Sequence, residues 1–417
     1  MTDAASNSRG HALVTGTGAV TPLGVGTDNF WDAALHGKSG AREITLFDPS
    51  PFPSHIAGEC RDFDPVDFVS KKEARRMDRY AQFGVAAGLE AAESAEIVQT
   101  LRESPERVAI VMGSGIGGLS TWEREYRVLN EKGAKRVSPF LITMMVPNMA
   151  AGQLAIALGA TGPTQCPVLA CATGGEAIAE GLELIRRGDA DVVIAGASEA
   201  PITPLSMAGF CAIRAISTRN EEPHRASRPF DADRDGFVMS EGAGAMVLES
   251  PEHAERRGAE PLAEVAGYGR TSDAYHVTAP DVEGRGVERA MRLALEDAGL
   301  SAEDVGHVNA HATSTPTGDG PETKAISRFL PHAAISATKS MTGHSFGAVG
   351  ATEGIMCALA LKHKVLPPTI NLDDLAEDCE PLDYVTEARE VSGLRAVVSN
   401  SMGFGGHNVV VAFASVE

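Results

Sequence analysis

The 417-residue chain has few aromatic side chains and little positive charge. Aromatic residues make up 5% of it, and 36 Lys and Arg stand against 56 Asp and Glu, for a formal net charge of −20. Proteins that bind nucleic acid or anionic membranes need basic surface to neutralise phosphate. This balance argues against nucleic acid or a membrane surface as a partner. Any acidic partner must therefore dock on a local basic patch.

Metal-binding and membrane patterns are also missing. None of the six cysteines forms a C-x-x-C pair, and Cys166 and Cys171 lack histidines at zinc-ligand spacing, so we expect no zinc site. No run of eighteen apolar residues predicts a membrane span. The polar start MTDAASNSRG lacks the apolar stretch of a signal peptide. We therefore expect a soluble protein of a reducing cytoplasm.

Short β-branched segments alternate with alanine-rich helical ones, which predicts a layered α/β fold. The pattern occurs twice, at 11–20, 107–115, 171–187, 191–199 and 244–250, and again at 263–273, 284–299, 306–313, after His344, 396–401 and 407–414. We interpret it as a degenerate internal duplication, with halves 1–258 and 259–417 that each hold one sheet. The stretches 45–80 and 119–150 are interpreted as insertions in the first half.

Cys171, in VLACATGG, stands at the start of a helix of small residues. A lone cysteine there is more often a buried small hydrophobe than a nucleophile. The helix N-terminus, however, would stabilise a thiolate and lower the pKa of the thiol, and the small residues would admit a substrate. Two downstream histidines, His311 in NAHATST and His344 in TGHSFG, favour the nucleophile. A thiol and two histidines are the functional groups that acyl transfer through a thioester uses.

Residues around the histidines fit the same chemistry. Thr313 and Thr315 add hydroxyls that can position a polar tail such as a phosphopantetheine arm. A helix follows His344, and a helix N-terminus disfavours imidazolium, so we expect a neutral ring. Lys339 and Glu353 lie among Ser, Gly and Ala, which predicts a buried ion pair.

Three glycine-rich or acidic motifs need separate interpretation. GFGG, at 403–406, is either an ordinary turn or the source of one oxyanion-hole amide, the other being that of Cys171. GSGIGG, at 113–118, matches a dinucleotide-binding pattern but lacks the acidic ribose partner about twenty residues on, so we reject it. DADRDGFVMSEG, at 231–242, resembles a calcium loop, but Glu241 comes one residue too early and the flanking helices are missing.

Ordered motifs run through nearly the whole chain: TGTGAVTPLG, SGIGGL, ACATG, STRNEEPHRASRPFDADRDGFV, NAHATSTPTGD, TKSMTGHSFGAVGATE and SMGFGGHN. Together they resemble the β-ketoacyl-[acyl carrier protein] synthases of the elongating type, class II. The resemblance implies a thiolase-like fold with two pseudo-symmetric halves in a five-layered α-β-α-β-α arrangement. It also implies a homodimer, acyl- and malonyl-loaded acyl carrier protein as partner, no redox cofactor and no catalytic metal.

The resemblance implies decarboxylative condensation of a malonyl thioester with a Cys-bound acyl chain. Cys171 would be the nucleophile, His311 and His344 would activate the malonyl group with Lys339 and Glu353 in support, and Phe404 would be the gate. Ile116, Leu141 and Phe210 would set acyl length. Some relatives hold a structural monovalent ion at positions matching Asn309, Glu353 and Asn400. The chain departs from many relatives at Ala312, Met402 and Leu141, which leaves the gate packing and the chain length open.

Basic residues gather at Lys71, Lys72, Arg75 and Arg76, and Arg214 is a further candidate. They form either a docking surface for an acidic carrier protein or a solvated helix face. Two other functions remain open: a ketosynthase of a polyketide or other specialised pathway, and a catalytically silent scaffold subunit. The intact nucleophile and histidines count against the scaffold.

Overall fold

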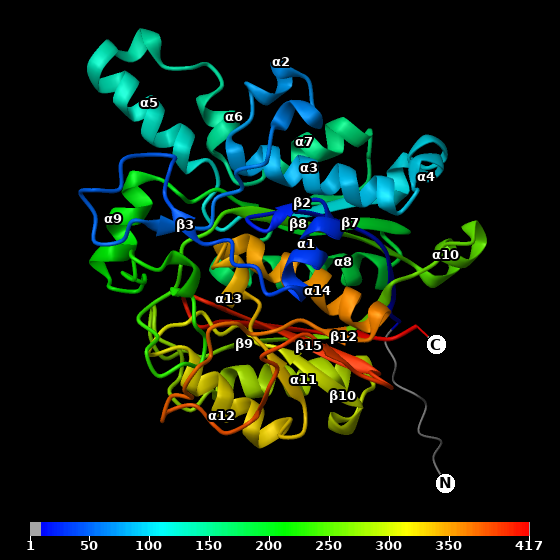
Figure 1. The fold of residues 1–417 in the computed structure, drawn as a ribbon. Coiled ribbons are helices and arrows are strands. Elements are labelled where there is room, and N and C mark those ends of the chain that lie inside the picture. Colours follow the sequence, from blue (N-terminus) through cyan, green and yellow to red (C-terminus); the bar gives the residue numbers. More distant parts are fainter. Residues whose placement is uncertain (1–9, 417) are drawn as a thin grey trace.

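The computed structural model describes residues 10–416, so most of the polar start MTDAASNSRG lies outside the described residues. Figure 1 shows five layers of alternating helix and sheet, with α3 above and α11 and α12 below. Two helices, α8 and α14, form the middle layer between the sheets. The predicted five-layered α/β arrangement is confirmed.

Both halves contain the same five-strand pattern. In the first half the order is β6 (Thr164–Gln165), β5 (Val108–Gly113), β7 (Val192–Glu199), β8 (Gly242–Glu249) and β1 (Ala12–Thr21). In the second half it is β11 (Ala334–Ser336), β10 (Val305–Asn309), β15 (Ala396–Gly403), β16 (His407–Ala414) and β9 (Ala263–Ser272). The first two pairings of each set are parallel and the last two antiparallel. This repeat confirms the internal duplication.

The helices repeat in the same way. Outer helices α3 (Arg79–Ser94) and α11 (Arg285–Ala298) each follow the first strand of their half, and α12 (Asp319–Phe329) packs beside α11. The central helices α8 (Thr173–Arg186) and α14 (Val349–His363) each precede the last two strands. The strand predicted at 306–313 ends at Asn309, which leaves His311 in the loop that follows.

Each half holds one run of sheet, as expected, but the two runs are joined. Residues 12–14 of β1 pair antiparallel with residues 263–265 of β9, so the two half-sheets join into one sheet of twelve strands. The physical reason is that β1 and β9 are the edge strands of their halves. Their free backbone N–H and C=O groups pair with each other instead of remaining unsatisfied inside the molecule.

The central helices approach each other closely at glycines near their N-terminal ends. A Cβ on Gly174 would lie 2.3 Å from the amide nitrogen of Ala351, and a Cβ on Gly350 would lie 2.6 Å from that of Gly175. No side chain fits such an approach. We expected the small residues after Cys171 to admit a substrate. These glycines instead allow α8 and α14 to pack together, which brings their N-terminal ends into contact.

The remaining elements lie around these layers. Helices α5 (Leu119–Lys132) and α6 (Leu141–Met145) project from the first half in Figure 1. The others are α1 (Thr27–Leu35), α2 (Lys71–Ala74), α4 (Val98–Glu103), α7 (Met149–Leu158), α9 (Pro204–Ala212), α10 (Pro251–Arg257), α13 (Lys339–Thr342), β2 (Gly24–Val25), β3 (Arg42–Glu43), β4 (Ile56–Ala57), β12 (Val365–Leu366), β13 (Asp383–Tyr384) and β14 (Arg389–Glu390). Among the described helices, none has the length and apolar character needed to cross a membrane.

Candidate active site

Cys171 lies in a short 3-10 turn, Ala170–Ala172, directly before α8. The residue before it, Ala170, has a φ of +48°, so the backbone turns sharply at the thiol. The Sγ atom lies 3.1 Å from Nε2 of His344, which is within hydrogen-bonding distance for sulfur. Both side chains are buried. The structure therefore pairs the predicted nucleophile directly with one of the two predicted histidines.

A cavity of about 450 Å³ opens onto this pair. Predicted site residues in its wall are Cys171, His311, His344, Thr313, Thr315, Arg214 and Phe404. Phe237, Phe346 and Met402 add apolar surface. The hydroxyl oxygens of Thr313 and Thr315 lie 3.1 Å apart. The cavity thus has a thiol and two imidazoles in its wall together with a pair of hydroxyls.

The backbone and the neighbouring rings fix His344. Its amide donates to the carbonyl of Val238 at 2.8 Å, and its carbonyl accepts from the amide of Ser240 at 2.9 Å. The rings of Phe346 and Phe237 pack against the imidazole at centroid distances of 4.9 and 5.5 Å. The imidazole therefore has little freedom to turn away from the thiol.

A buried carboxylate on α12 positions His311. The Glu322 side chain accepts the amides of His311 and Ala312, each at 2.8 Å, and the side-chain amide of Asn400 at 2.9 Å. The His311 ring faces that of His344 edge-on, with centroids 5.5 Å apart. The two imidazoles thus come from separate loops and converge on one point of the cavity.

Both histidines are neutral. Burial lowers the pKa of His311 and of His344 well below the usual range, and the charge of Lys339 lowers both further. The expectation of a neutral His344 is confirmed, although burial and Lys339 are the cause rather than the helix N-terminus. A neutral imidazole can accept a proton at one nitrogen and donate one from the other.

The prediction of a lowered pKa for Cys171 is wrong for this state of the protein. Burial raises the pKa of its thiol to about 12, and the charge of Glu199 acts in the same direction. Lys339 and the backbone amides of Phe404 and Cys171 oppose the rise. Desolvation therefore outweighs the helix terminus and favours the protonated thiol of Cys171 in this structure.

Lys339 and Glu353 form the predicted buried pair. Nζ of Lys339 donates to Oε1 of Glu353 at 2.6 Å, and the two side chains are 1% and 2% exposed. Burial raises the pKa of Glu353 to about 7, against the lowering effect of Lys339. The pair places a positive charge close to both histidines, since Lys339 lowers the pKa of each.

The GFGG segment forms a turn at the cavity mouth. Gly405 and Gly406 have φ values of +93° and +77°, which favour glycine. A Cβ on Gly403 would lie 2.5 Å from the carbonyl oxygen of Leu169, so this position packs directly on the segment that carries Cys171. Phe404 is 37% exposed, at the place expected of a gate. Of the two interpretations, the one with an oxyanion-hole amide fits this geometry better, because the Phe404 amide faces the thiol.

Sequence reasoning missed Glu199, the last residue of β7. It is fully buried, and its carboxylate accepts the Ser114 hydroxyl at 2.9 Å and the amides of Gly115, Ile116 and Gly347 at 2.7, 3.1 and 3.1 Å. It thus ties the first half to the turn that follows His344. An acidic residue at the end of the apolar run VVIAGASE was the available signal. Because it occupies two amides of GSGIGG, those amides are not free to hold a phosphate, in agreement with the rejected dinucleotide motif.

The proposed acyl-length residues lie away from this cavity. Phe210 packs against Phe237 and Phe346 at centroid distances of 5.3 and 4.8 Å. These two rings line the cavity and Phe210 does not, so Phe210 lies behind the cavity wall. Ile116 is 38% exposed, and Leu141 begins α6; neither lines the cavity. Their role in chain length stays a prediction.

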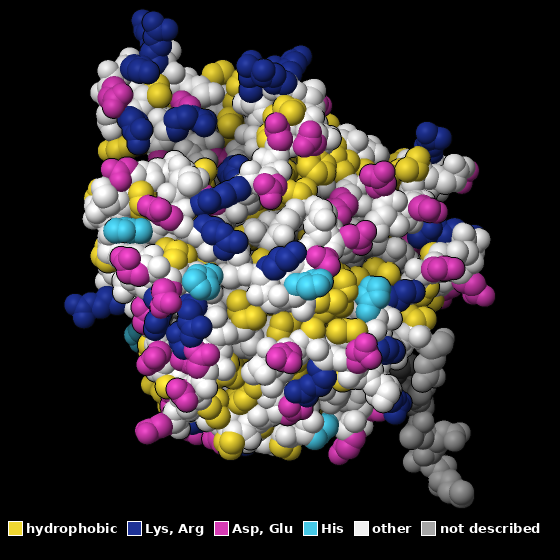
Figure 2. Space-filling view, viewed as in Figure 1, with side chains coloured by type: hydrophobic (Ala, Val, Ile, Leu, Met, Phe, Trp, Pro, Cys, Tyr) yellow, Lys and Arg dark blue, Asp and Glu magenta, His cyan; other side chains and the backbone are white. Residues whose placement is uncertain are grey.

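The proposed docking residues lie on two surfaces. Lys71, Lys72, Arg75 and Arg76 are exposed on and just after α2, where Figure 2 shows a dark-blue cluster at the top of the molecule. The Arg76 guanidinium stacks on the Phe140 ring at 4.9 Å. Arg214 is exposed and belongs to the wall of the cavity itself. Only Arg214 therefore joins the site directly.

Buried oxygens near Lys339 bear on the expected monovalent ion. Oε2 of Glu353 and Oδ1 of Asn400 are buried and have no hydrogen-bond partner among the described residues. Oδ1 of Asn309 has one long contact, 3.5 Å from the Thr338 hydroxyl, which also contacts Glu353. Hard oxygen donors of this kind suit a monovalent cation. Among residues 10–416, no group of three or more His, Cys, Asp or Glu could hold a metal ion.

Comparison with known proteins assigns this chain to a family. The model of the beta-ketoacyl synthase N-terminal domain matches residues 12–254, and that of the C-terminal domain matches residues 262–373. The chain is 46% identical to 3-oxoacyl-[acyl-carrier-protein] synthase 2 of Staphylococcus aureus (strain COL) over 97% of its length and 98% of that protein.

Solved structures agree in fold. A beta-ketoacyl synthase from Burkholderia phymatum STM815 matches with a TM-score of 0.90 and 35% identity, over 98% of this chain and all of that one. A chain of the AntDE:AntF complex, a type II PKS acyl-carrier protein with its ketosynthase, matches with a TM-score of 0.89 and 31% identity, over 97% and 99%. The boundary predicted at 258/259 falls between the two matched domains. With both domains matched in order along one chain, this protein belongs to the beta-ketoacyl synthase family.

Proposed function

We propose that the chain catalyses the decarboxylative condensation of malonyl-[acyl carrier protein] with an acyl group held on Cys171, giving a 3-oxoacyl-[acyl carrier protein] in fatty acid elongation. The observation that carries the proposal is the 3.1 Å contact between Sγ of Cys171 and Nε2 of His344, with His311 facing the same imidazole. This arrangement serves acyl transfer and enolate stabilisation in one cavity.

In the first step an acyl thioester enters the cavity and the Cys171 sulfur attacks its carbonyl carbon. His344 accepts the thiol proton at Nε2 and passes it to the carrier thiolate as that group leaves, so the imidazole ends neutral. The amides of Cys171 and Phe404 stabilise the oxyanion of the tetrahedral intermediate. Each such donor is worth roughly 3 kcal/mol in the transition state.

In the second step malonyl-[acyl carrier protein] enters and loses CO₂. The electron pair of the broken C–C bond forms an enolate, and an N–H of His311 donates to its oxygen. His344 joins it from Nε2 as the Nε2–H tautomer, which a neutral imidazole can also adopt. The enolate carbon then attacks the acyl carbonyl on Cys171, and the C–S bond breaks. The thiolate that leaves takes up one proton from solvent water, which restores the resting thiol. Neutral imidazoles suit this role, and burial, with the charge of Lys339 in addition, lowers the pKa of both.

The test is intact-protein mass spectrometry after incubation with acyl-carrier proteins of graded chain length. We expect a single acyl adduct on the wild type and on Cys166→Ala, and none on Cys171→Ala. Cys166 is the matched control because it lies five residues away and outside the cavity wall. An adduct that survives Cys171→Ala, or the absence of an adduct at every length, contradicts the proposal.

A specialised pathway is the second candidate for the same chemistry. The type II PKS complex resembles this chain in fold, but it is 31% identical against 46% for the fatty acid enzyme of S. aureus. The difference favours fatty acid elongation. A length profile limited to one unusual acyl group would favour the specialised pathway instead.

We also propose that the acidic carrier protein docks beside the cavity mouth, with Arg214 and the basic residues of α2 as contacts. The carrier must place its arm through the mouth, and Arg214 is the proposed docking residue in the cavity wall. Arg214→Glu should slow acyl loading and flatten its salt dependence, with Arg76→Glu showing a smaller effect. Unchanged loading kinetics for both variants would contradict the docking surface.

A homodimer is part of the proposal. Strand β6 ends the sheet with an open edge, and nearby apolar side chains are exposed, Ile156 by 74% and Val168 by 49%. An open edge and exposed apolar surface together mark an interface between chains. Sedimentation should show a dimer that Ile156→Glu weakens. A wild-type monomer at micromolar concentration would contradict it.

A monovalent cation held by Asn309, Glu353 and Asn400 completes the proposal. When bound, the ion would supply positive charge that balances the buried carboxylates beside Lys339. Asn400 also donates to Glu322, which accepts the His311 amide, and Glu353 accepts from Lys339. Replacing K⁺ and Na⁺ by a bulky organic cation should lower the melting temperature of the wild type more than that of Asn400→Ala. An equal response of the two proteins would contradict the site.

A further inference from the structure

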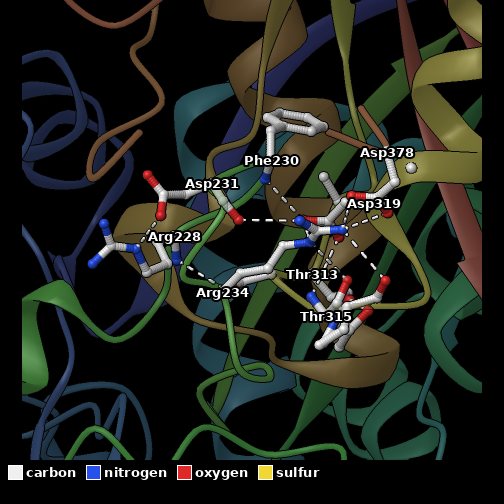
Figure 3. Close-up of polar contacts among 12 residues, drawn as sticks. Arg228, Phe230, Asp231, Arg234, Thr313, Thr315, Asp319 and Asp378 are labelled. Carbon is white, nitrogen blue, oxygen red and sulfur yellow. Dashed lines mark hydrogen bonds and ion pairs between the residues drawn. The ribbon is translucent and has the colours of Figure 1, made fainter. Parts of the chain in front are cut away.

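The segment that resembles a calcium loop has a different use in the structure. The Asp231 side chain accepts a hydrogen bond from the Arg228 guanidinium at 2.8 Å and from the amides of Asp233, Asp373 and Asp374 at 2.9, 2.8 and 3.0 Å. Its oxygens are therefore satisfied within the protein. Figure 3 shows this cluster beside Thr313 and Thr315 of the cavity wall.

The neighbouring loop, residues 313–316, needs external support. Ser314 at its centre is fully buried and has a φ of +69°, a left-handed conformation that is costly for a residue other than glycine. Its hydroxyl accepts the amide of Arg228 at 2.9 Å, and its carbonyl accepts the amide of Gly236 at 3.0 Å. The backbone of the 228–236 segment thus holds the middle of the loop.

The Arg234 side chain holds the second half of the loop, at Thr315 and Pro316. Nε donates to the Thr315 carbonyl at 3.1 Å and Nη2 to the Pro316 carbonyl at 3.3 Å. Two carboxylates fix the guanidinium itself: Asp378 at 2.7 Å and Asp319 at 3.7 Å. The Arg234 side chain is only 4% exposed. Figure 3 shows it extended between these carboxylates and the two threonines.

We propose that Arg234 is a positioning residue for the substrate arm, acting through Thr313 and Thr315. It does not line the cavity, whereas Thr313, Thr315 and Pro316 do. Two carbonyls of one strained loop bind to one planar, multi-donor group, so the loop adopts one conformation and presents both hydroxyls to the cavity. The inference rests on the proposed function, in which these hydroxyls hold the phosphopantetheine arm of the carrier protein.

The test measures condensation rates with malonyl-carrier protein varied at saturating acyl-carrier protein. In Arg234→Lys the positive charge remains beside Asp319 and Asp378, but the planar fork that reaches both carbonyls is lost. We expect KM for the malonyl-carrier to rise about tenfold while kcat stays within about twofold. The rate of Cys171 alkylation by iodoacetamide, which needs no arm, should stay at the wild-type value.

Arg228→Lys is the matched control. Arg228 is buried to the same degree as Arg234 and, like it, pairs with carboxylates, in this case Asp231 and Asp373. Its side chain makes no bond to the 313–316 loop. Its KM should stay within about twofold of the wild type, because the changed side chain shares no partner with the loop. A KM rise in Arg228→Lys equal to that in Arg234→Lys would mean a general structural effect and would overturn the inference.

A double-mutant cycle gives a second readout. Thr315→Val should raise KM in the wild-type background and have at least about threefold less effect in Arg234→Lys, because the two residues act through one loop. Equal effects in both backgrounds would overturn the inference. If Arg234→Lys fails to fold, Asp378→Asn replaces it, since Asp378 is half exposed and holds the guanidinium from outside. An unchanged KM in Asp378→Asn would overturn the inference as well.

The outcomes separate this inference from the proposed function. A wild type that forms no acyl adduct and releases no condensation product removes both. A wild type that condenses normally, with an unchanged KM in Arg234→Lys, removes only the role of Arg234.

Discussion

In the first half of the chain, the segment after β6 leads into α8 and carries Cys171; in the second half, the segment after β11 leads into α14 and carries His344. The two positions correspond under the internal duplication, and the glycine contact between the helices places them 3.1 Å apart at the reacting atoms. One supersecondary unit, used twice, thus supplies the proposed nucleophile in one copy and the proposed base in the other.

The two copies differ in what surrounds the helix start. The first half adds the buried carboxylate of Glu199, which raises the pKa of the thiol, whereas the second half adds Lys339, which lowers it. The second half also contributes His311 and the Phe404 amide. The proposed nucleophile is thus in one half, and most of the groups proposed to act on the substrate are in the other. This division makes the steps of the reaction separable by mutation.

The largest expected effect separates the two halves directly. Cys171→Ala should reduce condensation by at least about 10³-fold, because the acyl intermediate cannot form. The same variant should still release CO₂ from malonyl-carrier protein, since decarboxylation needs only the second-half histidines. His311→Ala should do the reverse, forming the acyl adduct while CO₂ release falls about 10²-fold. Labelled CO₂ and intact mass measure the two steps, and loss of both activities in both variants would contradict the division.

The second-largest expected effect concerns the buried Lys339–Glu353 pair of the second half. Glu353→Gln leaves Lys339 charged and unpaired in the interior, which should lower the free energy of unfolding by about 3 kcal/mol. Asp383→Asn is the control, because the Arg389–Asp383 pair is exposed and its loss should cost at most about 1 kcal/mol. Urea titration of both variants measures the difference. Equal midpoints would show that burial does not distinguish the two ion pairs.

The thiol of the first half should show its raised pKa in its reactivity. Because burial raises the pKa of Cys171 to about 12, its thiolate fraction should rise about tenfold per pH unit from pH 7 to pH 10. The alkylation rate by iodoacetamide, with Cys171→Ala as the background control, should rise in proportion. A plateau below pH 9 would mean that the thiol has an ordinary pKa in the working enzyme.

The smallest effect tests the link between the halves. The two carboxylate oxygens of Glu199 accept four hydrogen bonds, whereas the side chain of Gln has one acceptor oxygen. Glu199→Gln therefore removes part of the hydrogen bonding that holds the turn after His344. We expect kcat to fall about threefold while the KM for malonyl-carrier protein stays unchanged. A changed KM with normal kcat would place the effect at the cavity mouth instead.

The sequence predicted a large part of this site because the signals are local. The small-residue helix after Cys171, the loop of His311 and the charged pair among Ser, Gly and Ala all lie within short segments, so the sequence predicted their positions, although the small residues serve helix packing rather than the predicted substrate access. The repeat of strands and helices also appeared along the chain, so the duplication could be read from pattern alone.

Other features depended on contacts between distant segments. The role of Glu199 rests on amides near positions 115 and 347, and the pairing of β1 with β9 joins residues about 250 apart. The error on the Cys171 pKa has the same origin. A helix terminus is visible in the sequence, whereas the depth at which the fold buries the thiol is not.

The sequence by itself determined the chemical groups and the family to which they belong, since residue types and their order along the chain carry both. Only the tertiary structure decided their protonation states and the partner of each one. Solvent access and Coulomb interactions depend on distances in space, and folding sets those distances through contacts such as the glycine contact between α8 and α14.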